Sequence, residues 1–146
     1  MSHPDQQHML EPVHAGEDER EGKRWAQWLF IFLRVMAVVS LLKGIYHWSI
    51  VCGINAPSPG GFDDYRTPYQ AATVFFAVID LVAGVGLWLA APWGAVIWLT
   101  SVISMAAVEL LFPQIYGGNV WLVGIELVLL GIYLGLALMA AREQSA

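Results

Sequence analysis

Four long apolar segments, separated by breaks rich in proline or glycine, dominate the sequence between residues 25 and 141. A helix needs about 20 mostly apolar residues to cross the hydrocarbon core of a membrane. Each segment reaches that length, and we expect helices over about 26–53, 70–91, 93–112 and 119–141. A transmembrane β-barrel is excluded, because its strands are about half as long and alternate in hydropathy. The sequence therefore predicts an all-α integral membrane protein with four crossings.

The breaks predict how these helices are connected. The longest contains Asn55-Ala-Pro-Ser-Pro-Gly-Gly61, in which no helix can persist. The break at Pro92 is very short, and proline is tolerated in the first turn of a helix, so the second and third segments must form an antiparallel hairpin. Pro113 and the pair Gly117-Gly118 separate the third segment from the fourth. Short connections of this kind favour an antiparallel four-helix bundle.

The composition agrees with a membrane protein and excludes several other classes. The chain is 58% apolar and 13% charged, whereas soluble domains are about 45–50% apolar and about 25% charged. A net charge of −5 without a Lys or Arg cluster excludes nucleic acid as a partner, and the single Cys52 excludes an internal disulfide. The sequence contains no phosphate loop, dinucleotide-binding glycine motif, paired-cysteine metal site or nucleophile elbow. We therefore expect no enzyme, catalytic residue, metal site or cofactor, and a lipid bilayer as partner.

The first 24 residues differ from the rest. Residues 1–24 are polar and acid-rich, and they contain too few apolar side chains to offset the entropy lost on folding, which predicts a disordered tail. The tail carries three histidines that share no helical face, so no metal site is expected there. These histidines are His3, His8 and His14.

The basic residues predict the orientation in the membrane, because Lys and Arg favour the cytoplasmic side. Four of them lie just before the first segment or just after the last one, whereas the loops at the opposite side of the membrane carry only Arg66. Both the tail of residues 1–24 and the end at residues 142–146 are therefore predicted to be cytoplasmic. The four flanking bases are Arg20, Lys23, Arg24 and Arg142.

Five ionisable side chains lie inside the predicted crossings: Arg34, Lys43, Asp80, Glu109 and Glu126. A charge at the centre of a bilayer costs at least about 2.5–3.5 kcal/mol, so we expect these groups to meet one another. Counting about 1.5 Å of rise per residue from the inner boundary places Arg34 and Asp80 near mid-membrane and the other three in the outer half. The sequence therefore predicts two polar levels.

Helix geometry assigns partners within these levels. Positions 34 and 43 lie about 180° apart around a helix with 3.6 residues per turn, so one base serves each level. We expect Arg34 to pair with Asp80. His47 lies one turn beyond Lys43 on the same face, which predicts an outer pocket of Lys43, His47, Glu109 and Glu126. These groups can be structural pairs or a site for a solute, a proton or a quinone, and Arg34 can instead reach the inner surface.

Small residues in the last two segments suggest packing contacts. Gly124, Gly131 and Gly135 form a small-residue stripe that allows close approach of another helix, either of this chain or of a second copy or membrane-protein partner. Ser101 and Ser104 are expected to hydrogen-bond to the backbone of their own helix.

Several motifs together resemble known families. Leu33-Arg34, Lys43-Gly44 and Asp80-Leu-Val-Ala-Gly84-Val-Gly-Leu-Trp88 are similar to the DoxX-type four-helix membrane fold. Residues from about 33 to 140 also resemble an uncharacterised family of small alphaproteobacterial four-span proteins, a domain of unknown function. The resemblance implies an inner-membrane protein, sometimes associated with quinone-linked oxidoreductases, with no cofactor of its own. The matching motifs include Gly44-Ile-Tyr-His-Trp48, Pro92-Trp-Gly-Ala-Val-Ile-Trp98 and Phe112-Pro-Gln-Ile-Tyr-Gly117.

These observations favour a small, non-enzymatic protein of the bacterial inner membrane that acts as an accessory or structural subunit. Two alternatives remain open. One is a small transporter-like bundle that binds a solute or a proton in the outer pocket, and a water-accessible cavity at that level would favour it. The other is the membrane arm of a quinone-linked oxidoreductase complex.

Overall fold

The computed structural model describes residues 13–55 and 58–145, and it is helical without strands over this part of the chain. The four predicted long apolar helices are confirmed. The stretches long and apolar enough to cross a membrane are Lys23–Val51, Thr67–Trp88, Pro92–Leu111 and Val120–Arg142. The helices are α1 (Val13–Val51), the 3-10 turn η1 (Phe62–Asp64), α2 (Thr67–Trp88), α3 (Pro92–Leu111), α4 (Pro113–Tyr116) and α5 (Val120–Gln144).

The start of α1 corrects the prediction of a disordered tail over residues 1–24. The helix begins at Val13, so residues 13–24 continue the first crossing as helix. Adding a residue to an existing helix costs far less than nucleating a new one, and the apolar crossing supplies the nucleus. Residues 1–12, which include His3 and His8, and the side chain of His14 lie outside the described part.

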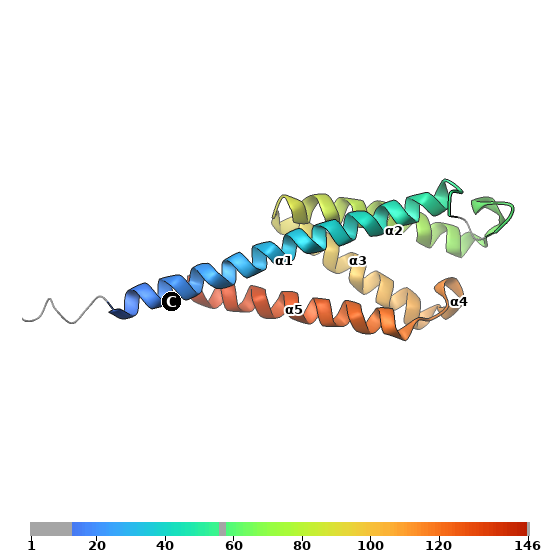
Figure 1. The fold of residues 1–146 in the computed structure, drawn as a ribbon. Coiled ribbons are helices and arrows are strands. Elements are labelled where there is room, and N and C mark those ends of the chain that lie inside the picture. Colours follow the sequence, from blue (N-terminus) through green and yellow to red (C-terminus); the bar gives the residue numbers. More distant parts are fainter. Residues whose placement is uncertain (1–12, 56–57, 146) are drawn as a thin grey trace, which may run out of the picture.

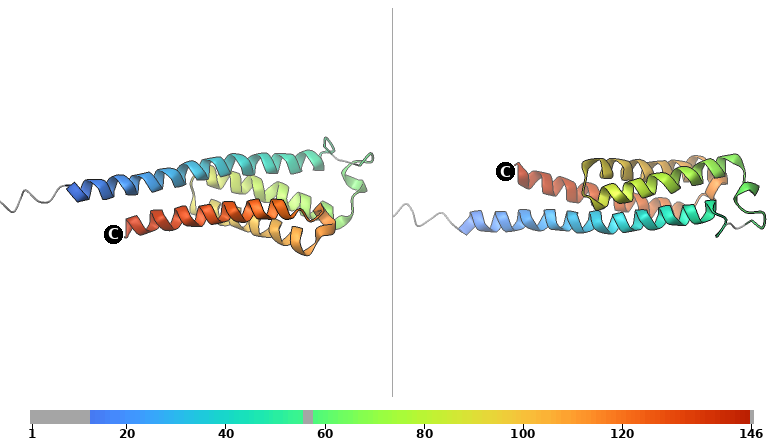
Figure 2. Two further views of the ribbon diagram at one scale, coloured as in Figure 1. Left: turned by 60° about the horizontal axis from the view of Figure 1, so that its bottom comes forward. Right: turned by 90° about the horizontal axis from the view of Figure 1, so that it is seen from above.

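The four long helices form a closed ring of contacts, because α1 packs against α2 and α5, and α3 packs against the same two helices. Successive long helices run in opposite directions (Figure 1). The first residues of α1 and the C-terminus therefore lie at the same end of the molecule in all views (Figure 2). At the other end the short helix α4 links α3 to α5, and the chain turns through Gly117 and Gly118, whose φ angles of 95° and 64° suit glycine.

The register between α1 and α2 is set by glycines. A Cβ at Gly44 would lie 2.7 Å from Leu81 Cγ, and a Cβ at Gly84 would lie 2.7 Å from Leu41 Cγ. The absence of a side chain at both positions lets the two helices approach closely, as small residues do in membrane helix pairs. These contacts place α2 so that Asp80 is level with Lys43.

Helix α5 is covered least by the rest of the chain. Among its described residues only Val123 is buried. The predicted packing stripe of Gly124, Gly131 and Gly135 does not meet another described helix. A Cβ at any of the three would have no atom within 4 Å apart from those of its chain neighbours and of the nearby backbone of α5. The stripe is therefore free to meet lipid or another protein.

Candidate functional site

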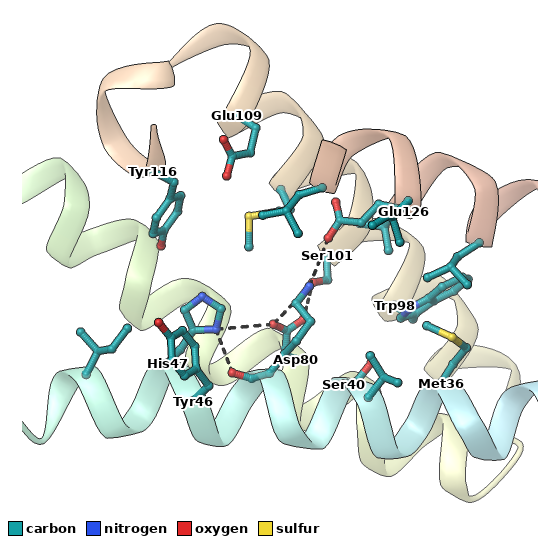
Figure 3. A pocket seen from close by; sticks show the side chains of 18 of the residues that line it. Met36, Ser40, Tyr46, His47, Asp80, Trp98, Ser101, Glu109, Tyr116 and Glu126 are labelled. Carbon is teal, nitrogen blue, oxygen red and sulfur yellow. Dashed lines mark hydrogen bonds and ion pairs between the residues drawn. The ribbon is translucent and has the colours of Figure 1, made fainter. Parts of the chain in front are cut away.

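A cavity of about 460 Å³ lies inside the ring of helices (Figure 3). All four long helices and Tyr116 of α4 line it, and most of its wall is apolar. Nine ionisable or hydroxyl-bearing side chains from the four long helices interrupt this wall, and several of them join in one network of contacts. They are Ser40, Lys43, Tyr46 and His47 from α1, Tyr69 and Asp80 from α2, Ser101 and Glu109 from α3, and Glu126 from α5.

Lys43 is the centre of this network. Its Nζ donates a hydrogen bond to Glu126 Oε1 at 3.3 Å and lies 3.8 Å from Asp80 Oδ2. Two carboxylates from two different helices therefore converge on one ammonium group. The sequence placed Lys43 and Glu126 together, and the structure does so, but it adds Asp80 to the same group.

Asp80 is the most deeply buried of these acids, with a side chain that is 2% exposed. Ser101 donates its hydroxyl hydrogen to Asp80 Oδ1, so the expectation that Ser101 bonds its own helix backbone is wrong. The other oxygen, Oδ2, is buried and has no hydrogen-bond partner among the described residues. The same holds for Oε2 of Glu126, whose side chain is 14% exposed.

His47 lies one turn beyond Lys43 on the same face of α1, as predicted. Its Nδ1 is 2.9 Å from the carbonyl oxygen of Lys43, which can only accept, so Nδ1 carries the proton and donates it. The same Nδ1 lies 3.9 Å from Asp80 Oδ2. In a neutral His47 the other ring nitrogen, Nε2, keeps a lone pair, and Figure 3 shows that side of the ring turned away from Asp80.

Glu109 lines the cavity but stands apart from the network around Lys43 (Figure 3). Its Oε2 accepts a hydrogen bond from the backbone N–H of Asn119 at 2.8 Å, immediately before α5 begins. The side chain of Asn119 in turn accepts from the N–H of Trp121 at 3.2 Å and caps that helix. A carboxylate is stabilised at a helix N-terminus, so Glu109 fixes the α3–α5 connection.

Tyr116 closes the end of the cavity nearest α4 together with aromatic neighbours. Its hydroxyl lies 3.2 Å from Thr73 Oγ1, and its ring centroid is 6.4 Å from that of His47 and 5.4 Å from that of Tyr69. Burial raises the pKa of Tyr116 to about 12, so its hydroxyl stays protonated at neutral pH. Beyond its place in the motif Phe112-Pro-Gln-Ile-Tyr-Gly117, nothing in the sequence marks Tyr116 as a cavity residue.

At the opposite end, Phe32, Trp98 and Tyr133 form an aromatic cluster, with ring centroids 5.5 to 6.3 Å apart. Trp98 is buried and also lines the cavity. The polar network therefore lies between two aromatic layers, which shield it along the axis of the helices.

The predicted pair of Arg34 and Asp80 is wrong. The guanidinium carbon of Arg34 lies 4.3 Å from the ring centroid of Trp88 and 4.8 Å from that of Phe30, while Asp80 meets Lys43 and His47. Depths counted from a common inner boundary assumed that the helices start level. The close contacts of Gly44 and Gly84 instead shift α2 along α1 and bring Trp88 to the level of Arg34.

The charges around Lys43 do not balance. When both acids are ionised and the neighbouring His47 is neutral, one ammonium faces the two carboxylates of Asp80 and Glu126. The dipole at the start of α5 serves Glu109 instead. An unbalanced charge in the membrane interior costs at least about 2.5–3.5 kcal/mol. No group of three His, Cys, Asp or Glu side chains in the described ranges has the arrangement of a metal site. The two carboxylates can instead accept hydrogen bonds from a small bound cation and balance its charge.

Residues 27–144 match a family of unknown function, DUF6163. The chain belongs to this family. The match covers α1 from residue 27 onwards, the whole of α2, α3 and α5, and every residue of the polar network around Lys43. Comparison with curated proteins finds no match, and comparison with solved structures finds none either.

Proposed function

We propose that this member of the DUF6163 family is a multi-pass membrane protein that binds a small ligand in the cavity between its helices. One observation carries the proposal: buried oxygens of Asp80 and Glu126, without hydrogen-bond partners, lie in the wall of a cavity of about 460 Å³. Buried polar groups normally have partners, and one that lacks a partner calls for an explanation, such as a bound ion, a water or a functional role. Ligand sites are typically mostly apolar hollows of about 300–1,000 Å³ with a few polar groups, and this cavity fits that description.

The proposal also covers the membrane, the fold and the orientation. We propose that the protein lies in a bacterial inner membrane, as an antiparallel, DoxX-like four-helix bundle with both termini in the cytoplasm. The bases at positions 20, 23, 24 and 142 support this orientation, because they gather at the end of the molecule where α1 begins and the chain ends, and Arg66 is at the other. No catalytic group is assigned, so the activity is binding or transport of a solute or a proton.

The test is to fill the cavity. The full chain is purified from membranes in mild detergent, and bound small molecules are detected by native mass spectrometry. Val102→Trp places a large ring in the cavity, whereas Val96→Trp makes the same change on the same helix at a position that is 61% exposed. We expect bound mass in the wild type and in Val96→Trp, and its loss in Val102→Trp.

A second filling variant guards against misfolding. Ile125 lines the cavity from α5 but is 56% exposed, so Ile125→Trp can narrow the cavity without disturbing a packed core. Variants are compared only when they elute as folded monodisperse species. The proposal fails if Val102→Trp and Ile125→Trp each carry as much bound mass as the wild type.

A second candidate function is that of a non-enzymatic accessory subunit, and α5 supports it. The uncovered stripe of Gly124, Gly131 and Gly135 suits close contact with a helix of another membrane protein or a second copy. The resemblance to DoxX-type proteins extends this candidate to the membrane arm of a quinone-linked oxidoreductase complex. Gly131→Leu with Gly135→Leu should then reduce the mass of the particle extracted in mild detergent, and an unchanged mass would exclude the contact.

A further inference from the structure

We infer that the ligand of this cavity is an amphipathic monocation with N–H donors, of the class of primary or secondary alkylammonium ions. The inference rests on the proposed function and adds the chemical class of the ligand. Three independent properties of the cavity point to it: its free hydrogen-bonding atoms, its charge and the distribution of its apolar wall.

The free hydrogen-bonding atoms are acceptors. Asp80 Oδ2 and Glu126 Oε2 both lack a donor, while Ser101 already donates to the other Asp80 oxygen. Lys43 Nζ is 3.3 Å from one acid and 3.8 Å from the other, so both acids are gathered around one point. A ligand that completes these bonds must supply at least two donors from one small group, which an ammonium does and a carbonyl or an ether does not.

The charge has the same implication. With His47 neutral and both acids ionised, Lys43 supplies only one positive charge to Asp80 and Glu126, so the group lacks one positive charge. A neutral ligand with hydroxyl groups could satisfy the oxygens but would leave the charge in place. A proton on one carboxyl would cancel the charge but would supply only one donor. A monocation with two or more N–H groups does both.

The apolar wall indicates the shape of the rest of the ligand. Trp98, Val102 and Leu129 line the cavity and pack in one apolar cluster with Phe32 and Tyr133. Figure 3 shows Trp98 at one end of the cavity and Asp80 and Glu126 nearer its middle. A ligand with its ammonium at the acids can extend an alkyl or aryl body along this wall. Trp98 would contribute further, because an indole ring offers a large apolar surface against which such a body can pack.

The inference is tested with four probes that have an eight-carbon chain and different head groups. Radiolabelled octylammonium is equilibrated with the full chain in lipid nanodiscs, and uptake by empty nanodiscs is subtracted. We expect saturable binding, with at least tenfold weaker competition by octyltrimethylammonium, which has no N–H, and by octanol, which has no charge. Octanoate should not compete.

Variants connect the binding to the named oxygens. Glu126→Gln and Asp80→Asn each remove one negative charge and should weaken octylammonium binding at least tenfold, while Val96→Trp at the lipid-facing surface should leave it unchanged. Equal competition by octanol, competition by octanoate, or unchanged binding in folded Glu126→Gln and Asp80→Asn would each overturn the inference.

The two proposals fail in different ways. If bound mass is lost on filling the cavity but octylammonium does not bind saturably, the ligand site stands and the alkylammonium class is refuted. If neither bound mass nor octylammonium binding depends on Val102 and Ile125, both proposals are refuted.

Discussion

Replacing Lys43 by methionine should destabilise the protein far more than the same replacement of Arg34, although both bases lie in the same helix. Lys43→Met leaves Asp80 and Glu126 facing each other without their base. Removing one partner of a buried ion pair costs about 3–5 kcal/mol. The Lys43 side chain is 33% exposed, so we expect the lower end, about 3 kcal/mol, or about two powers of ten in the folding equilibrium.

Arg34→Met removes only the contacts of a guanidinium with the rings of Phe30 and Trp88, which are worth about 0.5–1 kcal/mol where solvent or lipid head groups can reach them. The expected difference between the two variants is therefore about 2 kcal/mol. It is measured by titrating the detergent-solubilised protein with dodecyl sulfate and following tryptophan fluorescence.

A second substitution identifies the partners. Adding Glu126→Gln to Lys43→Met removes one of the two unpaired acids and should recover part of the lost stability. Adding Asp80→Asn to Arg34→Met should change the stability by the same amount as Asp80→Asn alone, because the two residues do not share a contact. If Arg34→Met is as damaging as Lys43→Met and Asp80→Asn rescues it, Arg34 is the partner of Asp80, and Asp80 does not belong to the polar network around Lys43.

Three further predictions concern packing, hydrogen bonding and pH. Gly94→Ala should cost about 1–3 kcal/mol, because its Cβ would lie 2.2 Å from the carbonyl carbon of Gly86. In the same unfolding titration, Gly131→Ala should be neutral or stabilising by up to about 1 kcal/mol. Similar values for both variants would contradict the close α2–α3 contact. Ser101→Ala should cost about 1–3 kcal/mol, because a second oxygen of Asp80 then loses its partner, and a loss below about 0.5 kcal/mol would argue against this hydrogen bond. Tyr116 has a pKa of about 12 in the folded chain against 10.0 as its ordinary value, so its contribution to stability is complete below pH 10 and is lost as the pH rises to 12. A Tyr116→Phe variant should show a shallower decline in stability over this range, and an identical decline would refute the assignment.

The crossings could be predicted from the sequence because hydropathy and helix breakers act locally. Pro92 and Pro113 each begin a helix in the structure, as their missing N–H and fixed φ favour. The grouping of Lys43 with His47 and Glu126 was also predictable, because two of them share a helix face and a buried base needs an acid. The first helix was predicted too short, since its continuation beyond the membrane depends on cooperativity and not on hydropathy.

The partner of Asp80 could not be found by counting depth. The relative shift of two helices depends on which side chains interlock, and here Gly44 and Gly84 decide it by admitting Leu81 and Leu41. A pattern of glycines on both helices was visible in the sequence, but it fixes a register only when the facing residues are known. The role of Ser101 was missed for the same reason, because its partner lies on a different helix.

The central claim is that acids from separate helices meet at Lys43 inside the membrane, and dipolar recoupling NMR of the protein in lipid bilayers tests it most directly. The chain contains only two lysines, Lys23 and Lys43, so ¹⁵Nζ labelling gives two signals. With ¹³C-labelled Asp and Glu carboxyl groups, the Lys43 signal should be strongly dephased, as its distances of 3.3 and 3.8 Å to carboxylate oxygens require, and Glu126→Gln should reduce the dephasing. A Lys43 signal that the carboxyl labels leave unaffected would contradict the account.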